Sequence, residues 1–187
     1  INASGSKFAV PPGPVYLNFP FNEPLMPDNV KGLNSPLLTV HDHSIPKFNL
    51  HIPKLTESKH PLIIVGPMEG NTHQDEIIEL SGGINAPMLA DPLSQIRFGA
   101  DSELILANYD IFLRYKNIEP DLIIRFGRKP TSKVLSQILE KWKTSTFLVD
   151  PWQKLNDDCP NFIQSAIGNY CRKQVKNIKW KGSSDWV

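Results

Sequence analysis

The sequence has few cysteines and lacks any long apolar run. Cys159 and Cys171 are its two cysteines, too few for a disulfide-stabilised scaffold, and this number fits a reducing, cytoplasmic compartment. The longest continuous apolar segments, such as residues 62–65 and 122–124, are far too short to span a bilayer. No charged stretch followed by an apolar one, the pattern of a secretory signal, is visible. We therefore expect a globular cytoplasmic protein without a membrane span.

The sequence also lacks an excess of charge of either sign. Its 20 lysines and arginines are balanced by 19 aspartates and glutamates, which leaves a net charge of +1. A nucleic-acid-binding module or a polybasic membrane binder would carry a basic excess, so both classes are disfavoured. The 187 residues suit one ordinary domain. Because the chain starts at Ile1 rather than methionine, we expect it to be a piece of a longer protein. Residues 1–6 could be a cloning remnant.

Proline is concentrated near the start of the chain. Ten of the 17 prolines lie between Pro11 and Pro61. Proline blocks helix interiors and central strands, so this part is predicted to be extended. A short strand is predicted at residues 15–19, followed by a long connection over residues 25–61.

From residue 62 onward, short apolar segments alternate with amphipathic ones. Residues 62–65 and 121–126 are β-branched runs followed by glycine, which is typical of strands buried on both faces. Further strands are predicted at residues 86–90, 145–149 and 162–167. Helices are predicted at residues 71–80, 102–115, 131–142 and 169–176. This alternation predicts an α/β fold, with a parallel sheet covered by helices on both faces.

Single residues predict three of the helix boundaries. Thr72 and Ser102 are predicted to cap the first two helices, and Gly82 with Gly83 is predicted to end the first. In open α/β sheets, ligands bind beyond the carboxyl ends of the strands. We therefore expect any ligand to bind at the loops of residues 66–72, 90–102, 127–131 and 150–161.

Glycines follow the first buried strand, where a dinucleotide-binding fold has its glycine-rich turn. Residues 66–70 lack the G-x-G-x-x-G pattern, and Pro67 removes one amide donor that a pyrophosphate would use. Asp91 closes the next predicted strand, where an acidic residue could bind ribose hydroxyls. Turn glycines and a loop aspartate explain these residues more simply than NAD or FAD binding does.

Other reactive side chains lack the partners that their chemistry needs. His41 and His43 could supply two metal ligands, but no third ligand follows at a supportive spacing. Cys159 and Cys171 have neither a C-x-x-C motif nor a neighbouring histidine, and Ser94 has no base at a fixed spacing. The residues themselves therefore predict no metal site, catalytic thiol or nucleophilic triad.

A basic segment leads into the predicted helix at residues 131–142. A helix N-terminus attracts anions, so Arg128, Lys129 and Lys133 would ordinarily be avoided there. Their presence suggests a shared bound anion, and Arg97, in another carboxyl-end loop, could point toward the same edge. The alternative is a solvated basic loop.

Three segments of the sequence, residues 13–25, 87–97 and 120–133, resemble segments of one known family. This family comprises the 2-succinyl-5-enolpyruvyl-6-hydroxy-3-cyclohexene-1-carboxylate (SEPHCHC) synthases, which are thiamine-diphosphate enzymes of menaquinone biosynthesis. Residues 13–25 (GPVYLNFPFNEPL) are similar to the family segment that leaves the pyrimidine-binding domain and enters the central domain. Residues 87–97 (PMLADPLSQIR) and 120–133 (PDLIIRFGRKPTSK) are similar to two further family segments. The resemblance covers residues 8–150 in register.

The resemblance implies a domain organisation. Residues 1–25 would be a crossing segment between domains, and residues 26–187 a central Rossmann-like domain with six parallel strands. Tyr16 stands where the family usually has histidine, and Asn22 stands where arginine is frequent. We therefore assign to neither side chain a contact that the usual residue makes in the family.

The resemblance also implies an activity for a longer parent chain. SEPHCHC synthases use thiamine diphosphate and Mg²⁺ to decarboxylate 2-oxoglutarate and to add the succinyl unit to isochorismate. The residues that bind both cofactors belong to the flanking pyrimidine-binding and diphosphate-binding domains of the same chain. This chain alone is therefore expected to bind no cofactor and to be inactive, and the parent is expected to be a homo-oligomer.

Three basic residues are the candidate site residues that the resemblance implies. Lys133 matches the lysine of the family's G-x-x-x-x-[GS]-K segment, which reaches the substrate pocket, so it is expected to bind a substrate carboxylate. Arg97 and Arg128 are candidates for a regulatory anion site that senses 1,4-dihydroxy-2-naphthoate, a downstream aromatic carboxylate. Pairing of these arginines with carboxylates such as Asp91 or Asp101 is the alternative. The second functional hypothesis is an independent nucleotide-binding Rossmann-like module.

Overall fold

The computed structural model describes most of the later part of the chain. The chain divides into two compact units, Ile1–Pro46 and Lys47–Val187. The described residues are Pro14, Tyr16 and Asn18, and residues 57–70, 73–98, 101–142, 144–152, 157, 159–179 and 181–186. The domain boundary predicted between residues 25 and 26 lies outside them and stays a prediction.

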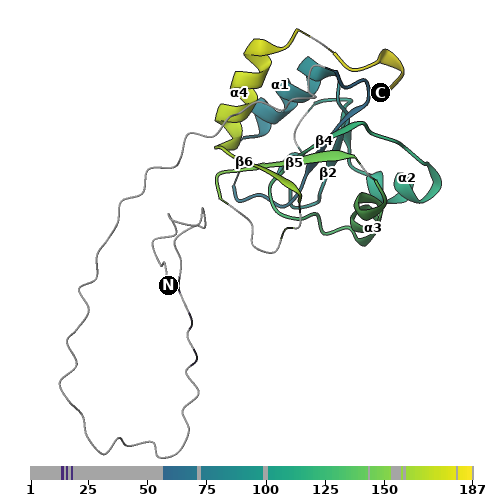
Figure 1. Cartoon of the computed structure of the whole chain (residues 1–187). Helices are drawn as coiled ribbons and strands as arrows, with labels where there is room; N and C mark the ends of the chain where they lie inside the picture. Colours follow the sequence, from purple (N-terminus) through teal and green to yellow (C-terminus); the bar gives the residue numbers. More distant parts are fainter. Residues whose placement is uncertain are drawn as a thin grey trace, which may run out of the picture. The chain divides into compact units, whose positions relative to one another are not determined.

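Within the described residues, six parallel strands form one sheet in the order β3-β2-β1-β4-β5-β6. Their bounds are β1 Pro61–Val65, β2 Met88–Ala90, β3 Ile105–Leu106, β4 Leu122–Phe126, β5 Ser145–Asp150 and β6 Asn161–Gln164. This is the strand order of the doubly wound dinucleotide-binding folds. The predicted α/β, Rossmann-like parallel sheet is confirmed (Figure 1).

Strands β1 and β4 occupy the centre of the sheet. They pair with Ile63 opposite Ile124, and every residue of both strands is buried. Their continuous apolar runs suit this place, because a central parallel strand is covered on both faces. Arg125 is the charged exception, and its guanidinium forms a two-pronged ion pair with the buried Asp157 carboxylate at 2.8 and 2.7 Å. A buried charge needs such a partner, so this pair also ties residue 157 to the sheet.

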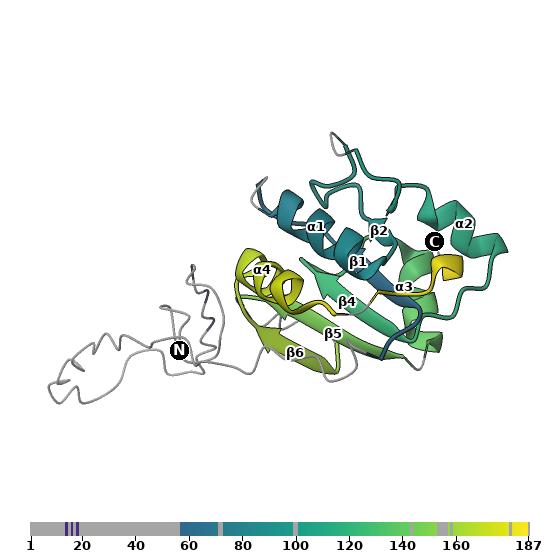
Figure 2. The ribbon, with the colours of Figure 1, turned by 90° about the horizontal axis from the view of Figure 1, so that it is seen from above.

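Helices cover both faces of the sheet. α1 (Gln74–Ile84) and α4 (Ile167–Asn177) pack side by side on one face, and α2 (Tyr109–Tyr115) and α3 (Lys133–Lys141) lie on the other (Figure 2). Each pair buries its apolar side against the sheet, as the amphipathic spacing predicts. Among the described helices, none has the length and apolar character needed to cross a membrane.

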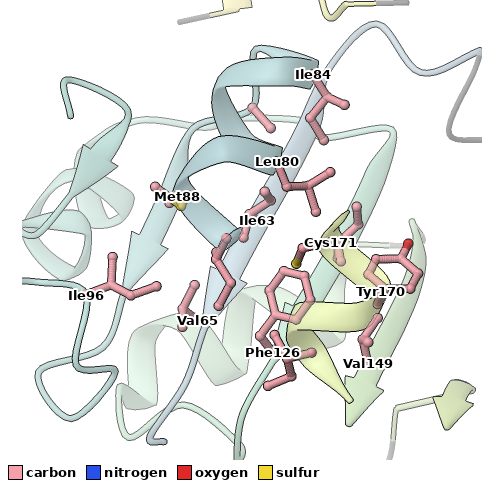
Figure 3. Packing of buried hydrophobic residues seen from close by; sticks show 14 of the residues in the cluster. Ile63, Val65, Leu80, Ile84, Met88, Ile96, Phe126, Val149, Tyr170 and Cys171 are labelled. Atoms are coloured by element: carbon pink, nitrogen blue, oxygen red, sulfur yellow. The ribbon is translucent and has the colours of Figure 1, made fainter. Parts of the chain in front are cut away.

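The larger apolar core lies between the sheet and the pair α1 and α4. In Figure 3, side chains of both helices meet those of the central strands. The rings of Phe126 and Tyr170 meet edge to face, with centroids 6.2 Å apart. Tyr170 is fully buried, its hydroxyl has no hydrogen-bond partner among the described residues, and burial raises the pKa of this phenol. A buried hydroxyl without a partner is an energetic cost within an otherwise apolar core.

The predicted end of the first helix was wrong. α1 continues through Gly82 and Gly83 to Ile84, and its C-cap, Asn85, adopts the left-handed conformation with φ of 50°. Asparagine tolerates this conformation, so it takes the terminating role that the glycines were predicted to have. The predicted cap Thr72 lies outside the described residues. His73 precedes the helix and makes no capping hydrogen bond through its side chain.

The predicted helix at residues 102–115 was wrong over its first half. Residues 105–106 form the edge strand β3, paired with β2, and the helix begins only at Tyr109. Ser102 is therefore not its cap. The apolar residues Leu104 and Ile105 fit a strand as well as a helix over so short a run, and pairing with a neighbouring strand decides between the two.

Few residues of the first unit are described. Tyr16 and Asn18 belong to no strand, so the strand predicted at residues 15–19 is wrong at these two positions. The rest of that strand, Asn22 and the pair His41 and His43 lie outside the described residues.

The incoming segment, residues 57–60, is fixed at the amino edge of the sheet. The carboxylate of Asp121, just before β4, accepts hydrogen bonds from the Ser58 hydroxyl and from the amides of Lys59 at 2.7 Å and His60 at 3.1 Å. Burial alone would raise the pKa of Asp121, but these three hydrogen bonds together hold it below its usual value.

The outgoing segment, residues 181–186, returns to the same edge and ends in a short 3-10 helix, η1 (Ser184–Trp186), that the sequence did not predict. The Trp186 ring stacks on His60 with centroids 4.8 Å apart, and its indole N–H donates to the Pro61 carbonyl at 2.6 Å. The Ser183 amide donates to the Lys59 carbonyl at 2.8 Å. Incoming and outgoing segments are therefore bound directly to each other.

Candidate functional site

Three loops meet at the carboxyl edge of the sheet. β1 leads into α1 on one face and β4 leads into α3 on the other, so the direction of winding changes between these two neighbouring strands. Open α/β sheets bind their ligands at such a switch point. The loops after β1, β2 and β4 begin at Gly66, Asp91 and Gly127.

Main chain fills the switch point itself. The Arg128 amide donates to the Pro67 carbonyl, and the Gly66 amide donates to the Phe126 carbonyl, both at 2.9 Å. A Cβ on Gly66 would lie 1.8 Å from the Arg128 carbonyl oxygen. Gly127 has a φ of +75°, and a Cβ there would lie 2.7 Å from the Pro67 carbonyl oxygen. Both positions therefore require glycine so that two backbones can touch.

The glycine-rich turn after β1 has its amides largely engaged. The Met68 amide donates to the Leu93 carbonyl at 3.1 Å, and Pro67 has no amide hydrogen. A dinucleotide pyrophosphate is bound by free amides at this turn. The turn thus offers fewer donors than a dinucleotide fingerprint needs.

Asp91 ties the loop after β2 to the start of α3. Its side chain belongs to a residue only 1% exposed. One carboxylate oxygen accepts from the Leu93 amide at 2.9 Å, and the other accepts from the Thr131 amide at 2.8 Å and the Thr131 hydroxyl at 2.7 Å. Both oxygens of the residue that the sequence suggested for a ribose contact are therefore engaged inside the protein.

Ser132 and Asp110 join the start of α3 to α2. Ser132 is the N-cap of α3, and its hydroxyl oxygen accepts from the Leu135 amide at 3.0 Å. The same hydroxyl donates to Asp110 at 2.5 Å. This hydrogen bond, aided by Arg114 and opposed by burial, holds the pKa of Asp110 below its ordinary value. Asp110 has no signal in the sequence that marks it for this contact, because nothing local connects residue 110 with residue 132.

Lys133 is the first residue of α3 and is exposed. Within the part of the chain that the structure describes, its ammonium group forms no ion pair. The structure therefore places an exposed cation at the carboxyl edge, next to the helix N-terminus that Ser132 caps. Its role in binding a substrate carboxylate stays a prediction.

Arg97 and Arg128 lie in different loops of this edge and have different partners. Arg128 forms an exposed ion pair with Glu69. The guanidinium carbon of Arg97 lies 5.8 Å from the centroid of the exposed Phe98 ring. Exposed pairs of this kind contribute about 0–1 kcal/mol. The regulatory anion site predicted for the two arginines stays a prediction.

The two cysteines lie in different surroundings. Cys171 belongs to α4 and is buried in the apolar core, where burial raises its pKa to about 12. Cys159 borders a cavity of 180 Å³ between α3 and the sheet, together with Arg125 and Lys129. Burial also raises the pKa of the Cys159 thiol. Raised values disfavour the thiolate, the reactive form of cysteine.

The metal ligands considered from the sequence, His41 and His43, lie outside the described residues. Among the described residues, no group of three or more histidine, cysteine, aspartate or glutamate side chains could hold a metal ion. The carboxyl edge of this part of the chain is therefore built from glycines, paired carboxylates and exposed basic groups.

The chain is similar to known proteins over nearly its whole length. No protein-family model matches the chain. The chain is 30% identical to a SEPHCHC synthase of Haloquadratum walsbyi, and the match covers 94% of the chain and 33% of that protein. It is 29% identical to the enzyme of that name from Bacillus cytotoxicus, with 98% of the chain and 35% of the relative covered. The chain is homologous to a segment of the SEPHCHC synthases.

A third SEPHCHC synthase, from Listeria monocytogenes, is 35% identical over 75% of the chain and 27% of its own length. The resemblance that the sequence motifs indicated is therefore confirmed. The chain spans about one third of the length of the curated relatives it matches.

Two of the three segments that resemble SEPHCHC synthases form the carboxyl edge. Residues 87–97 contain β2 and the Asp91 loop, and residues 120–133 contain β4 and the start of α3. The hydrogen bonds from Thr131 to Asp91 join these two segments directly. The third segment, residues 13–25, lies mostly outside the described residues.

Proposed function

We propose that this chain is the non-catalytic central domain of a SEPHCHC synthase, a thiamine-diphosphate-dependent transferase of menaquinone biosynthesis. The parent would decarboxylate 2-oxoglutarate and add the succinyl unit to isochorismate. The observation that carries the proposal is the extent of the match, which covers 94–98% of this chain but only about one third of each relative. The remaining two thirds of such a parent would supply the cofactor-binding domains.

The geometry of the switch point favours a scaffold over an independent nucleotide-binding module. Glycine backbones fill the place between β1 and β4, and Pro67 and Met68 offer no free amide there. The described residues also contain no group of metal ligands suited to the Mg²⁺ of the cofactor. No step of the reaction is therefore assigned to thiamine diphosphate held by this chain.

Lys133 is the residue that we propose to reach the substrate. It is an exposed cation at the carboxyl edge, and both proposed substrates carry carboxylates. A lysine ammonium donates charge-assisted hydrogen bonds to a carboxylate. Loss of one such bond costs on the order of 1.5–3 kcal/mol, which is roughly a ten- to hundredfold loss in kcat/KM.

The test is a comparison of two lysines at opposite ends of α3 in the whole enzyme. Lys133→Ala is expected to lower kcat/KM for one anionic substrate by roughly ten- to hundredfold. Lys141→Ala, at the last residue of the same helix and exposed, is the matched control and is expected to leave the kinetics unchanged. Equal kinetics of the Lys133→Ala enzyme and the unaltered enzyme toward both substrates would remove Lys133 from the site.

The scaffold role has a separate test that does not depend on Lys133. The 187-residue chain is titrated calorimetrically with thiamine diphosphate and Mg²⁺, with FAD and with NAD. We expect no saturable binding of any of them. Saturable micromolar binding of FAD or NAD would favour the alternative, an independent nucleotide-binding module. A whole parent protein without SEPHCHC synthase activity would contradict the proposed enzyme.

A further inference from the structure

Carboxylates from two separate elements hold the start of α3. Asp91, at the end of β2, accepts two hydrogen bonds from Thr131, and Asp110, in the first turn of α2, accepts one from Ser132. The next residue along the chain is Lys133. The two residues that precede this lysine are therefore fixed relative to both the sheet and α2.

Asp91 is the firmer of the two anchors. Asp91 is 1% exposed, whereas the side chain of Asp110 is 43% exposed and is shared with Arg114 at 3.1 Å. Thr131 supplies two of the three donors that satisfy the buried Asp91 carboxylate. Release of Thr131 would leave a buried charge short of donors, so the contact is strongly favoured.

The surroundings of the Asp91 carboxylate are largely closed to water. Tyr109, the first residue of α2, is 3% exposed. Burial, followed by the charges of Asp91 and Asp110, raises the pKa of Tyr109 to about 12. Hydrogen bonds in such buried surroundings are stronger than those in water, which favours the contacts that Asp91 makes with Thr131.

We propose that Asp91 is a positioning residue for Lys133, acting through Thr131 and the first turn of α3. The inference rests on the proposed function, in which Lys133 binds an anionic group of the substrate. Asp91 does not touch the substrate, but it fixes the main chain from which the flexible lysine projects. Displacement of a positioning group by about 1 Å can cost up to a hundredfold in an oriented reaction.

A matched pair of substitutions at Thr131 tests the contact in the whole enzyme. Thr131→Val keeps the shape and the backbone amide but removes the hydroxyl donor, whereas Thr131→Ser keeps that donor. We expect Thr131→Val to raise the KM of the substrate that Lys133→Ala affects by roughly three- to tenfold, with kcat changed much less. Thr131→Ser is expected to restore the original KM. An unchanged KM for Thr131→Val, or an equal rise for both variants, overturns the inference.

A double-mutant cycle then tests whether Thr131→Val raises the KM by displacing Lys133. If it does, Thr131→Val causes no further loss once Lys133→Ala is present, because the positioned group is gone. Additive losses would show that Thr131 and Asp91 affect the enzyme independently of Lys133. That outcome would overturn the positioning role of Asp91 but would leave the proposed role of Lys133 unchanged. If Lys133→Ala itself has no effect, the proposed role of Lys133 is wrong and this inference is wrong with it.

Amide hydrogen exchange in the 187-residue chain supplies a readout that needs no activity. Asp91→Ala removes both oxygen acceptors, so exchange at the Thr131 amide is expected to accelerate at least tenfold. Amides in the central strands β1 and β4 report whether the fold survives and are expected to keep their protection. Unchanged protection at Thr131 in a folded Asp91→Ala chain overturns the proposed anchor.

Discussion

The two edges of the same sheet are held together by different means. At the amino edge, side chains bind backbone: Asp121 accepts from two amides, and the Trp186 indole donates to the Pro61 carbonyl. At the carboxyl edge, two backbones touch where Gly66 and Gly127 have no side chains. The first arrangement can lose one contact and keep the others. The second has no room for even one added carbon.

The contrast predicts where the fold tolerates substitution. Each side-chain contact at the amino edge makes its own contribution to the free energy of unfolding. The contact at the carboxyl edge forms only if both positions are glycine, because any Cβ there would clash with the facing backbone. The carboxyl edge also leaves Lys133 exposed, while its neighbours Thr131 and Ser132 are bonded to carboxylates. Rigid main chain beneath an exposed charged side chain is the arrangement that ligand binding requires.

Gly66→Ala is expected to have the largest effect. Its methyl group would lie 1.8 Å from the Arg128 carbonyl oxygen, which belongs to backbone and cannot rotate away. We expect the free energy of unfolding to fall by more than about 3 kcal/mol. Urea denaturation followed by circular dichroism measures this loss.

Gly82→Ala is the matched control for that substitution. Gly82 lies within α1, is exposed, and has nothing within 4 Å of an added Cβ. We expect the same chemical change to stabilise the chain by about 0.5–1 kcal/mol, because alanine is the better helix former. A comparable loss for both variants would show that the close approach at Gly66 is not what limits the carboxyl edge.

Trp186→Phe should have an intermediate effect at the amino edge. Phenylalanine can still stack on His60 but cannot donate to the Pro61 carbonyl. We expect a loss of about 0.5–1.5 kcal/mol in the free energy of unfolding. Thermal unfolding of Trp186→Phe beside Trp186→Ala separates the hydrogen bond from the stack. Equal melting temperatures for the unaltered chain and both variants would contradict a fastening role for Trp186.

Asp121 should make the amino edge sensitive to acid. Its folded pKa lies below the unfolded value, so its contribution is fully present above the unfolded pKa and is lost as the pH falls through the folded pKa. Asp121→Asn is expected to flatten the dependence of unfolding free energy on pH below about pH 4. Denaturation curves measured from neutral to acidic pH check this, and parallel curves for both chains would contradict it.

Tyr170→Phe, a substitution in the core between the two edges, should have the smallest effect. The substitution removes a buried hydroxyl that has no partner within the part of the chain that the structure describes, and it keeps the ring that packs against Phe126. We expect the free energy of unfolding to stay within about 0.5 kcal/mol or to rise slightly. A loss above about 1 kcal/mol, measured by urea denaturation, would show that the hydroxyl is bonded in solution.

The sequence predicted the centre of the fold better than its borders. The runs around Ile63 and Ile124 are apolar at every position, and only a strand covered on both faces suits such a pattern. Residues 105–106 were misassigned because a two-residue edge strand exists only through its pairing with β2. Gly82 and Gly83 were misread because packing against α4 and the sheet sustains α1 beyond them.

The candidate site could be located but not assembled from the sequence. Strand ends indicated the carboxyl edge, and the similarity to SEPHCHC synthases indicated Lys133. The hydrogen bonds from Thr131 to Asp91 join residues 40 positions apart, and the pair of Arg125 with Asp157 spans 32 positions. Neither contact has a local sequence signal, because long-range side-chain pairs depend on the folded register of the strands.

The contact between the incoming and outgoing segments has a consequence for how this domain can be rearranged. Lys59 and Ser183 share a hydrogen bond of 2.8 Å, so the two ends of the folded core are neighbours in space. A short peptide could join them, and new termini could be opened at an exposed surface loop without crossing the sheet. The core is thus suited to circular permutation, and to insertion as a domain into a surface turn of an unrelated host protein.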